Sequence, residues 1–419
     1  MDQRTAMKIV FYNHTGKVSG AERVLMTVLA RLDAAIERVL LCPIAGPLAE
    51  NVAATGTRVE DVAELGARFT WRPDRLISYL LSFRHVITEF RRKIVALDAD
   101  LIHANSIRAG LVATAATVGL QTKVVWHLHD LLPAHPFSSA IRLFAACSRR
   151  SRMIAVSEAV RNNFCGRLTT LLGSRVTVIL NAIDVQSFLA DNTDRNVLRE
   201  RLSIREGEFA VGIVGQLTPR KGQLELLIAF ADFLQTNPAA VLLIVGAPIF
   251  NRDADYEQEL RQKAAQLGIN HRVRMLGNRN DVRDVMRALD LLVVNSRREP
   301  FGLVACEAMA CGTPVLATAA DGLPEIIKHE QNGWLVPCGD RSELVRALRL
   351  LSEDAGRRKH LASTALQDIA RRFTIERYID ELEDFYQRIS DEHFTIEKSV
   401  PASGQNQPAN FAEYYHERI

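Results

Sequence analysis

Short runs of β-branched and other apolar residues alternate along this chain with longer amphipathic segments, and the alternation occurs in two successive series. A short apolar run bounded by turn residues is typical of a buried strand, whereas a longer amphipathic segment is typical of a helix that covers a sheet. Strands that alternate with helices form parallel sheets, because parallel neighbours need a long crossover connection. The pattern therefore predicts an α/β fold with two tandem, doubly wound, Rossmann-like domains.

The first series occupies the amino-terminal half of the chain. Its predicted strands are Lys8–Asn13, Arg38–Cys42, Asp100–His103, Lys123–His127, Met153–Val156 and Val176–Leu180. Segments with helical spacing lie between these strands, and they include Ala21–Leu32, Pro73–Ala96 and Ser157–Phe164.

The second series begins at Phe209. Its predicted strands are Phe209–Gly215, Val241–Gly246, Val273–Leu276, Leu291–Asn295 and Pro314–Ala317. Its predicted helices lie near Gln223–Leu234, Asp255–Leu267 and Leu303–Ala310.

The polar stretch Asp191–Glu208 separates the two series. We therefore expect a first domain at residues 1–203 and a second domain at residues 204–374. A late amphipathic segment, residues 375–392, follows the second series, and we expect a helix there that packs back on the first domain. The tail at residues 393–419 is polar and rich in Pro, Gly and Gln, a composition that predicts disorder.

The composition is that of an ordinary globular protein, with 47% hydrophobic and 24% charged residues. These values exclude a collagen-like or largely disordered chain. The net charge of +3 gives no indication of nucleic-acid binding. Basic side chains are in excess in the first 203 residues and acidic ones in the remainder, so the two halves are expected to bind different molecules.

The six cysteines contain no Cys-x-x-Cys pair, which argues against a zinc site and against a disulfide framework. The apolar run Ile9–Tyr12 is too short for a signal peptide. The uncharged stretch Ala109–Thr122 is shorter than the roughly 20 apolar residues that cross a bilayer. We therefore expect a cytoplasmic protein that does not span a membrane.

Four places carry residues suited to chemistry, and the first is the turn from His14 to Glu22. Gly20 lies at the predicted start of a helix, where backbone N–H groups and the helix dipole favour an anion. The turn matches neither a Walker A loop nor Gly-x-Gly-x-x-Gly. From these residues alone, a strand–helix turn that needs a glycine is the favoured interpretation.

The second place is the pair His127 and His129 at the end of a predicted strand. Residues two apart in a strand point the same way. For His127 we favour a histidine in the core, whereas His129 stands at the strand's carboxyl end, the usual ligand edge of a parallel sheet. No third metal ligand is apparent nearby, so the pair does not predict a metal site.

The third place is the loop Gly215–Gly222, which follows the first strand of the second domain. Lys221 and the loop's backbone donors could hold a phosphate there, with Arg220 beside them. A solvated cation pair in a turn is the alternative.

The fourth place is the segment around Glu299 and Glu307. From Pro300 through Ala320, Glu307 is the only charged side chain, and it lies in a predicted helix of small and apolar residues. A carboxylate is expensive to bury unless it accepts hydrogen bonds, and the hydroxyls of a ribose could donate them. Glu299 precedes that helix at the same ligand edge. A structural carboxylate that caps a turn is the weaker alternative.

Together these places resemble the retaining glycosyltransferases of family 4. The Glu-x7-Glu signature is matched by Glu299 and Glu307 within EPFGLVACEAMACGTPVL, and the similarity extends over roughly residues 8–390. Supporting matches are Ser-Gly-Ala-Glu at 19–22, His129-Asp130, Asn181-x-x-Asp184 and Gly-Trp-Leu-Val-Pro at 333–337. The resemblance implies the glycosyltransferase-B (GT-B) fold, with a nucleotide-sugar bound in the cleft between the domains.

The resemblance also assigns roles. It places Glu307 on the ribose hydroxyls, Glu299 on the donor sugar, Lys221 on the diphosphate and His129 beside the transferred sugar. Backbone amides near the start of the helix would hold the sugar or diphosphate, and Gly20 would approach from the other domain; the amides belong to Gly302, Leu303 and Val304.

The chain departs from the family pattern at two positions near this site. Gln216 stands where the family usually has arginine, so one cationic contact is absent or is supplied by Arg220. Asp321 stands where a glycine is common.

The implied function is metal-independent transfer of a sugar from a nucleotide-sugar to a saccharide or lipid-linked acceptor, with retention of configuration, in cell-surface polysaccharide or glycolipid synthesis. The second domain's ligand loops contain no Asp-x-Asp, because Asp253-Ala254-Asp255 is assigned to a surface turn, and no cofactor is expected. The alternatives are a sugar-nucleotide epimerase and a catalytically weak nucleotide-sugar-binding protein.

A basic amphipathic segment between Trp71 and Ile94 suggests a further partner. Its apolar residues have helical spacing, and its cations are Arg72, Arg75, Arg84, Arg91, Arg92 and Lys93. A second basic cluster consists of Arg149, Arg150 and Arg152. Such a segment can rest on anionic headgroups, which would place the enzyme peripherally on the inner face of the cell membrane. A core-packing helix with a solvated basic face is an equal alternative.

Overall fold

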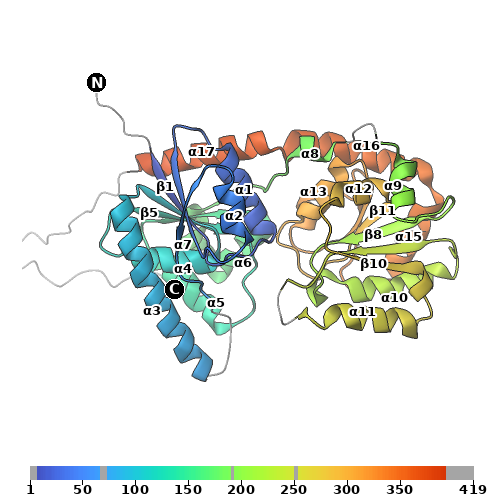
Figure 1. Ribbon diagram of the computed structural model, residues 1–419, viewed down its shortest axis with the longest axis horizontal. Helices are drawn as coiled ribbons and strands as arrows, with labels where there is room; N and C mark the ends of the chain where they lie inside the picture. The colour runs from blue at the N-terminus through green and yellow to red at the C-terminus, as the bar shows by residue number, and fades with distance from the viewer. Residues whose placement is uncertain (1–6, 67–72, 190–192, 250–252, 393–419) are drawn as a thin grey trace, which may run out of the picture.

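Two α/β bodies lie next to each other along the long axis of the molecule (Figure 1). The computed structural model describes residues 7–66, 73–189, 193–249 and 253–392. The predicted tail at 393–419, together with Trp71 and Arg72 of the basic segment, lies outside the described residues. The prediction of two Rossmann-like α/β domains is confirmed.

The first sheet has seven parallel strands in the order β3-β2-β1-β4-β5-β6-β7. Their bounds are β1 Lys8–Tyr12, β2 Glu37–Cys42, β3 Arg58–Asp61, β4 Leu101–Ala104, β5 Lys123–Leu128, β6 Ser151–Ala155 and β7 Val176–Val178. Six of these strands match predicted ones. The sequence pattern misses β3, because this edge strand reads Arg-Val-Glu-Asp and is not fully buried anywhere.

The second sheet has six parallel strands in the order β10-β9-β8-β11-β12-β13. Their bounds are β8 Ala210–Val214, β9 Val241–Val245, β10 Val273–Gly277, β11 Leu291–Val294, β12 Val315–Thr318 and β13 Trp334–Val336. Central strands such as β9, Val-Leu-Leu-Ile-Val, are buried throughout because helices cover both faces. The pattern misses β13, which has only three residues.

Helices cover both sheets. In the first half of the chain these are α1 Gly20–Arg31, α2 Pro47–Ala53, α3 Pro73–Leu97, α4 Ile107–Ala116, α5 Pro136–Cys147, α6 Glu158–Cys165, α7 Thr169–Leu172 and α8 Val185–Phe188. The remainder are α9 Arg195–Arg201, α10 Gln223–Leu234, α11 Tyr256–Gln266, α12 Val282–Ala288, α13 Leu303–Ala310, α14 Leu323–Ile326, α15 Arg341–Glu353, α16 Ala355–Arg372 and α17 Ile375–Asp391. No helix within the described ranges is long and apolar enough to cross a membrane.

Both sheets reverse their strand order at one point, between β1 and β4 in the first and between β8 and β11 in the second. In open parallel sheets, ligands bind beyond the carboxyl ends of the strands at such a switch point. The topology therefore selects the loops that follow these four strands as the place to look for a site.

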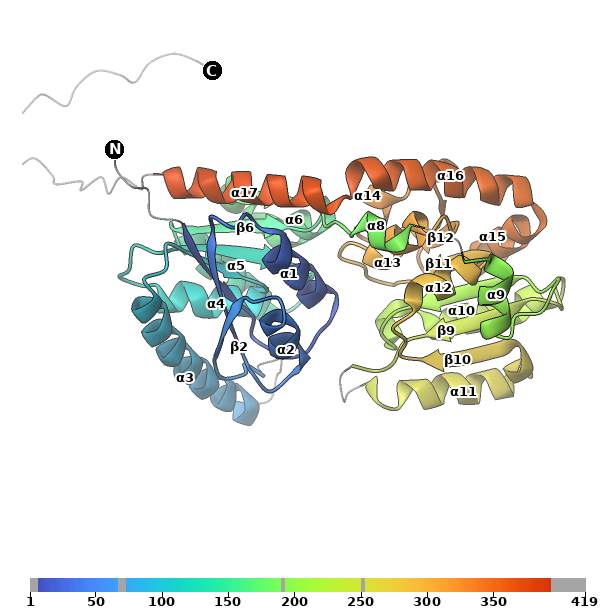
Figure 2. The ribbon, with the colours of Figure 1, turned by 45° about the horizontal axis from the view of Figure 1, so that its top comes forward.

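The last helix, α17, crosses from the second body and runs along the first (Figure 2). Its apolar face is buried, and its Tyr386 hydroxyl lies 2.7 Å from His103 Nδ1 in the first sheet. His103 Nε2 in turn lies 3.1 Å from His127 Nδ1. The expectation that His127 is a core histidine is confirmed, since it is 1% exposed and surrounded by these groups.

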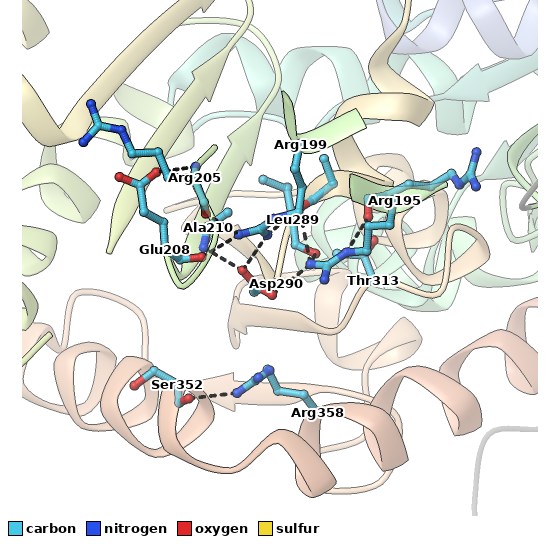
Figure 3. Close-up of polar contacts among 12 residues, drawn as sticks. Arg195, Arg199, Arg205, Glu208, Ala210, Leu289, Asp290, Thr313, Ser352 and Arg358 are labelled. Atoms are coloured by element: carbon cyan, nitrogen blue, oxygen red, sulfur yellow. Dashed lines mark hydrogen bonds and ion pairs between the residues drawn. The ribbon is translucent and has the colours of Figure 1, made fainter. Parts of the chain in front are cut away.

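Helix α9 belongs by its contacts to the second sheet, although it precedes residue 203. Asp290, at the amino end of β11, accepts hydrogen bonds from Arg195 at 2.8 Å, from Arg199 at 3.0 Å and from the Ala210 amide at 2.8 Å (Figure 3). We therefore propose that the domain boundary lies before α9. A surface cavity of about 800 Å³ lies beside these residues. It is at the amino ends of the strands, whereas the switch-point loops follow their carboxyl ends.

Replacing Asp290 with alanine should destabilise the second domain. The largely buried Arg199 would lose its carboxylate partner, at a cost of about 3 kcal/mol in unfolding free energy. Burial opposes ionisation of Asp290, but its hydrogen bonds and the two arginines hold its pKa below the ordinary value. The stabilisation should therefore be present at neutral pH and disappear as the pH falls through that lowered pKa. Calorimetric unfolding of the wild type and the variant, at neutral pH and at a pH below that lowered pKa, measures the difference in stability.

The control is Arg261→Ala, which removes an exposed pair with Glu257 on α11. That change should alter the unfolding free energy by about 0.5 kcal/mol or less. Equal losses in the two variants would contradict the role given to Asp290.

Candidate functional site

An ion pair joins the loops that follow β8 and β11, the two strands at the second switch point. Lys221 ends the short helix η3 (Pro219–Lys221), and its Nζ lies 2.5 Å from Glu299 Oε2. The two loops are also tied by Asn295, whose side-chain amide donates to the Gly222 carbonyl at 2.9 Å. Two predicted site residues, 78 positions apart in the sequence, thus meet directly.

Glu299 is held as an anion in a buried place. It is 6% exposed, and Ser296 donates to the same carboxylate oxygen at 2.7 Å. Burial alone would raise the pKa of Glu299. The charges of Lys221 and Arg220 and the hydrogen bonds from Lys221 and Ser296 outweigh it and hold the pKa below its ordinary value.

Asp321 shapes the loop that carries Glu299. Its φ of +43° lies in the left-handed region, which explains why glycine suits this position. Its carboxylate accepts a hydrogen bond from the Glu299 amide at 2.9 Å and pairs with Arg298 at 2.9 Å. The aspartate therefore contributes contacts to the Glu299 loop that a glycine could not make.

Glu307 differs from Glu299 in its surroundings, because no side chain or amide among the described residues donates a hydrogen bond to it. It lies partly buried on α13. Burial raises the pKa of Glu307, and the charges of Arg23 on α1 and Lys221 only partly oppose this effect. The alternative role as a cap of a neighbouring turn therefore has no support, and the carboxylate remains available to a ligand with donor groups.

The start of α13 packs closely against neighbouring side chains and against the start of α1. Gly302, its N-cap, has φ +119°, and a Cβ there would lie 2.7 Å from Leu323 Cδ2. The next residues, Leu303 and Val304, begin the helix, where free amides and the helix dipole favour an anion. Gly20 begins α1 in the first domain, and a Cβ on it would lie 3.7 Å from Leu303 Cδ1. Two helix amino termini from different domains thus lie against each other.

Two further polar residues of the loop Gly215–Gly222 make hydrogen bonds to other parts of the protein. The Gln216 side chain donates to Asp253 at 3.5 Å, and the Arg220 guanidinium donates to the Arg298 carbonyl at 3.0 Å. Arg220 still lies close enough to Glu299 to lower its pKa. The charge of Arg220 thus acts on Glu299, whereas the Gln216 side chain is neutral and supplies no charge there.

His129 directly follows β5, the strand next to β4 at the switch point of the first sheet. It is 9% exposed, and burial lowers its pKa to about 3, so it is neutral. Its Nε2 lies 2.9 Å from Asn105 Oδ1, and Asn105 donates to Asn13 Oδ1 at 3.0 Å. Neither asparagine is among the site residues predicted from the sequence. The signal that could have found them is their position directly after β4 and β1.

Two helix termini and a lysine, which favour an anion, thus lie close to carboxylates that could accept hydrogen bonds from hydroxyl groups. Across the described ranges, no group of three His, Cys, Asp or Glu side chains could hold a metal ion. Metal-independent chemistry stays a prediction.

Comparison with known families gives two matches that together cover most of the chain. The model described as "Glycosyltransferase Family 4" matches residues 18–187, and the model described as "Glycosyl transferases group 1" matches residues 194–368. The matches separate between α8 and α9.

Two relatives are D-inositol 3-phosphate glycosyltransferases. That of Stackebrandtia nassauensis is 31% identical over 326 residues, which are 73% of this chain and 71% of that protein. That of Salinispora tropica is 37% identical over 232 residues, 53% of this chain and 48% of that protein, so the alignment spans about half of its length.

Solved structures agree with these matches. Anabaena HepE, in complex with UDP and glucose, has a TM-score of 0.79 and 28% identity, covering 91% of this chain and 99% of that chain. Sucrose-phosphate synthase from Thermosynechococcus elongatus, at 21% identity, shares the fold with a TM-score of 0.74 and covers 91% and 99% of the two chains. The chain therefore belongs to the family 4, group 1 glycosyltransferases and has their GT-B fold of two Rossmann-like domains.

Proposed function

We propose that this protein moves a sugar from a UDP-sugar to a saccharide or lipid-linked acceptor, with retention of configuration, in the synthesis of a cell-surface polysaccharide or glycolipid. The observation that carries the proposal is the buried Lys221–Glu299 pair near the carboxylate of Glu307, to which no described residue donates a hydrogen bond. The UDP part is supported by HepE, which was solved with UDP and with UDP-glucose.

The donor is proposed to bind with its diphosphate between the helix termini at Gly20 and Leu303. Glu307 accepts hydrogen bonds from the ribose hydroxyls, and Glu299 accepts them from the sugar. Because Lys221 already pairs with Glu299, one cation serves both the carboxylate and the diphosphate beside it. The loops supply this arrangement before the donor arrives, which lowers the cost of orienting it.

In a retaining transfer, the acceptor hydroxyl attacks the face from which the diphosphate leaves. The bond from sugar C1 to the acceptor oxygen forms as the bond from C1 to the phosphate oxygen breaks, and the acceptor's proton passes to the departing phosphate. Negative charge develops on that phosphate. Lys221 and the amides at the start of α13 would stabilise it.

Glu299→Gln tests the role in catalysis. A panel of UDP-sugars ranked by thermal stabilisation first selects the donor. If Glu299 interacts with the sugar mainly in the transition state, release of UDP from that donor should slow by about 10- to 150-fold, the equivalent of about 1.5–3 kcal/mol for a charged hydrogen bond. Donor affinity should change far less. Turnover near that of the wild type would refute the assignment.

Glu307→Gln tests the role in nucleotide binding. An ionised carboxylate can accept from both ribose hydroxyls, whereas a protonated one loses acceptor capacity. Because the pKa of Glu307 is raised, wild-type affinity for uridine should weaken as the pH falls, starting at a higher pH than for an ordinary glutamate. The variant should bind about tenfold more weakly at neutral pH and lose this pH dependence. Calorimetric affinities that are equal for both proteins would favour a structural carboxylate.

We also propose peripheral contact between α3 and anionic membranes. Ile77, Leu80 and Leu81 are 62%, 62% and 63% exposed, and with Arg84 they have the spacing i, i+3, i+4 and i+7 of a single helix face. Exposed apolar side chains that gather on one face are typical of an interaction surface. The beginning of α3 projects below the rest of the first domain in Figure 1.

Most other cations of the two basic clusters serve the fold. Arg91 donates to backbone carbonyls after α4, and Lys93 pairs with Glu60. Arg150 donates to a backbone carbonyl, and Arg152 pairs with Glu392 next to α17. The membrane proposal therefore rests on the exposed Arg84, Arg92 and Arg149.

Co-sedimentation with phosphatidylserine-containing vesicles tests this contact. Binding should require the anionic lipid and weaken at high salt, and Leu80→Ser combined with Leu81→Ser should reduce it at least tenfold, because each leucine loses about 1.5 kcal/mol or more of burial. Leu171→Ser is the control, since Leu171 is 56% exposed on α7, away from this face. Absence of sedimentation at low salt, or unchanged binding of the double variant, would reject the contact.

A further inference from the structure

A chain of buried hydrogen bonds runs from α1 to His129 through two asparagines. Glu22 Oε1 accepts from Asn13 Nδ2 at 3.3 Å, Asn13 Oδ1 accepts from Asn105 Nδ2 at 3.0 Å, and Asn105 Oδ1 lies 2.9 Å from His129 Nε2. All four residues are 9% exposed or less. Each of them comes from a different element or loop of the first domain, so the tertiary fold alone brings them together.

The direction of this series of hydrogen bonds is determined by a group that can only accept. The Asn13 Nδ2 group also donates to the Thr15 carbonyl at 2.7 Å, and a carbonyl cannot donate. Asn13 must therefore present its oxygen to Asn105. Asn105 must therefore donate from its Nδ2 group to that oxygen, and its own Oδ1 then faces His129.

His129 Nε2 must then carry the proton. The opposite tautomer would place two lone pairs against each other in a buried position, which leaves both acceptors unsatisfied. The His129 ring is also held in place by the His127 ring, with centroids 3.8 Å apart. Nδ1 of His129 has no hydrogen-bond partner among the described residues, so it is the nitrogen that remains for a ligand.

We propose that Glu22, Asn13 and Asn105 are positioning residues that hold His129 in its Nε2–H tautomer. In that tautomer His129 Nδ1 accepts a hydrogen bond from a hydroxyl of the bound sugar, and the ring donates no hydrogen bond to the sugar. The part that concerns the sugar rests on the proposed function. This arrangement selects for a sugar that presents a hydroxyl donor at that point.

The capping box of α1 gives Glu22 its fixed position. Ser19 donates to Glu22 Oε2 through its backbone amide at 2.9 Å and through its hydroxyl at 2.5 Å. One carboxylate oxygen thus caps the helix while the other orients Asn13. The Ser-Gly-Ala-Glu turn therefore combines the approach of Gly20 to the second domain with control of a histidine on the far side of the switch point.

The tautomer is measured directly by 15N NMR of the full-length protein with labelled histidine rings. The ring nitrogens of the two tautomers have different shifts, and the His129 signals are assigned by their loss in His129→Gln. Without any ligand, His129 should show a protonated Nε2 and an unprotonated Nδ1. A protonated Nδ1 in the wild type would overturn the proposal.

Asn105→Leu should release the constraint. His129 should then populate both tautomers, and UDP release from the selected UDP-sugar should slow by about tenfold, as expected for one misplaced hydrogen bond. Asn332→Leu is the matched control, because it removes the hydrogen bonds of another buried asparagine, to the Ile326 carbonyl and to Asp368 in the second domain, and touches none of the residues that connect Glu22 to His129. It should leave the His129 signals and the rate unchanged.

The outcomes separate this inference from the proposed function. If Asn105→Leu keeps the wild-type tautomer, the positioning role is wrong, whatever the enzyme transfers. If Asn105→Leu fails to fold, Asn105→Ser supplies the same readout with a smaller side chain. If the ligand-free tautomer is as expected but no UDP-sugar shifts His129 Nδ1 or is turned over, the tautomer stands and the proposed donor is wrong.

Discussion

The interaction on which the site depends is the ion pair between Lys221 and Glu299. A carboxylate that is only 6% exposed needs a cation and hydrogen bonds, or it would take up a proton. Lys221 and Ser296 supply them from two loops, and Asp321 fixes the backbone of the same glutamate from a third. The loops after β8, β11 and β12 are thereby held in one arrangement, with the start of α13 among them.

Contacts between the domains originate from the same loops. Ser157, the N-cap of α6, donates to the Pro300 carbonyl at 2.6 Å, next to Glu299. Glu325 of α14 accepts from the amides of Glu158 and Ala159 at 2.8 Å each, which satisfies the amino terminus of α6. The domains therefore meet through helix termini whose polar groups need partners. The loops after β11 and β12 are connected to the first domain by hydrogen bonds as well as by α17.

Much of the fold could be predicted because buried parallel strands leave a strong local signal. Central strands and the helices α10 and α13 are found with bounds close to those observed, whereas the edge strands β3, which is polar, and β13, which has three residues, are missed. Helix α9 could not be assigned to a domain from its local sequence. Its sequence indicates a polar linker, but Arg195 and Arg199 attach it to Asp290 far along the chain.

The sequence by itself determined the fold class, because hydrophobic period and turn residues are local properties. It also singled out the unusual charges of the second domain, since a glutamate in an apolar helix is costly wherever it lies. Only the tertiary structure decided which groups are paired. It joined Lys221 to Glu299, left Glu307 without a hydrogen-bond donor among the described residues and connected Glu22 to His129 through Asn13 and Asn105. Hydrogen bonds of this kind depend on distances between residues that are remote in sequence, and no local pattern encodes those distances.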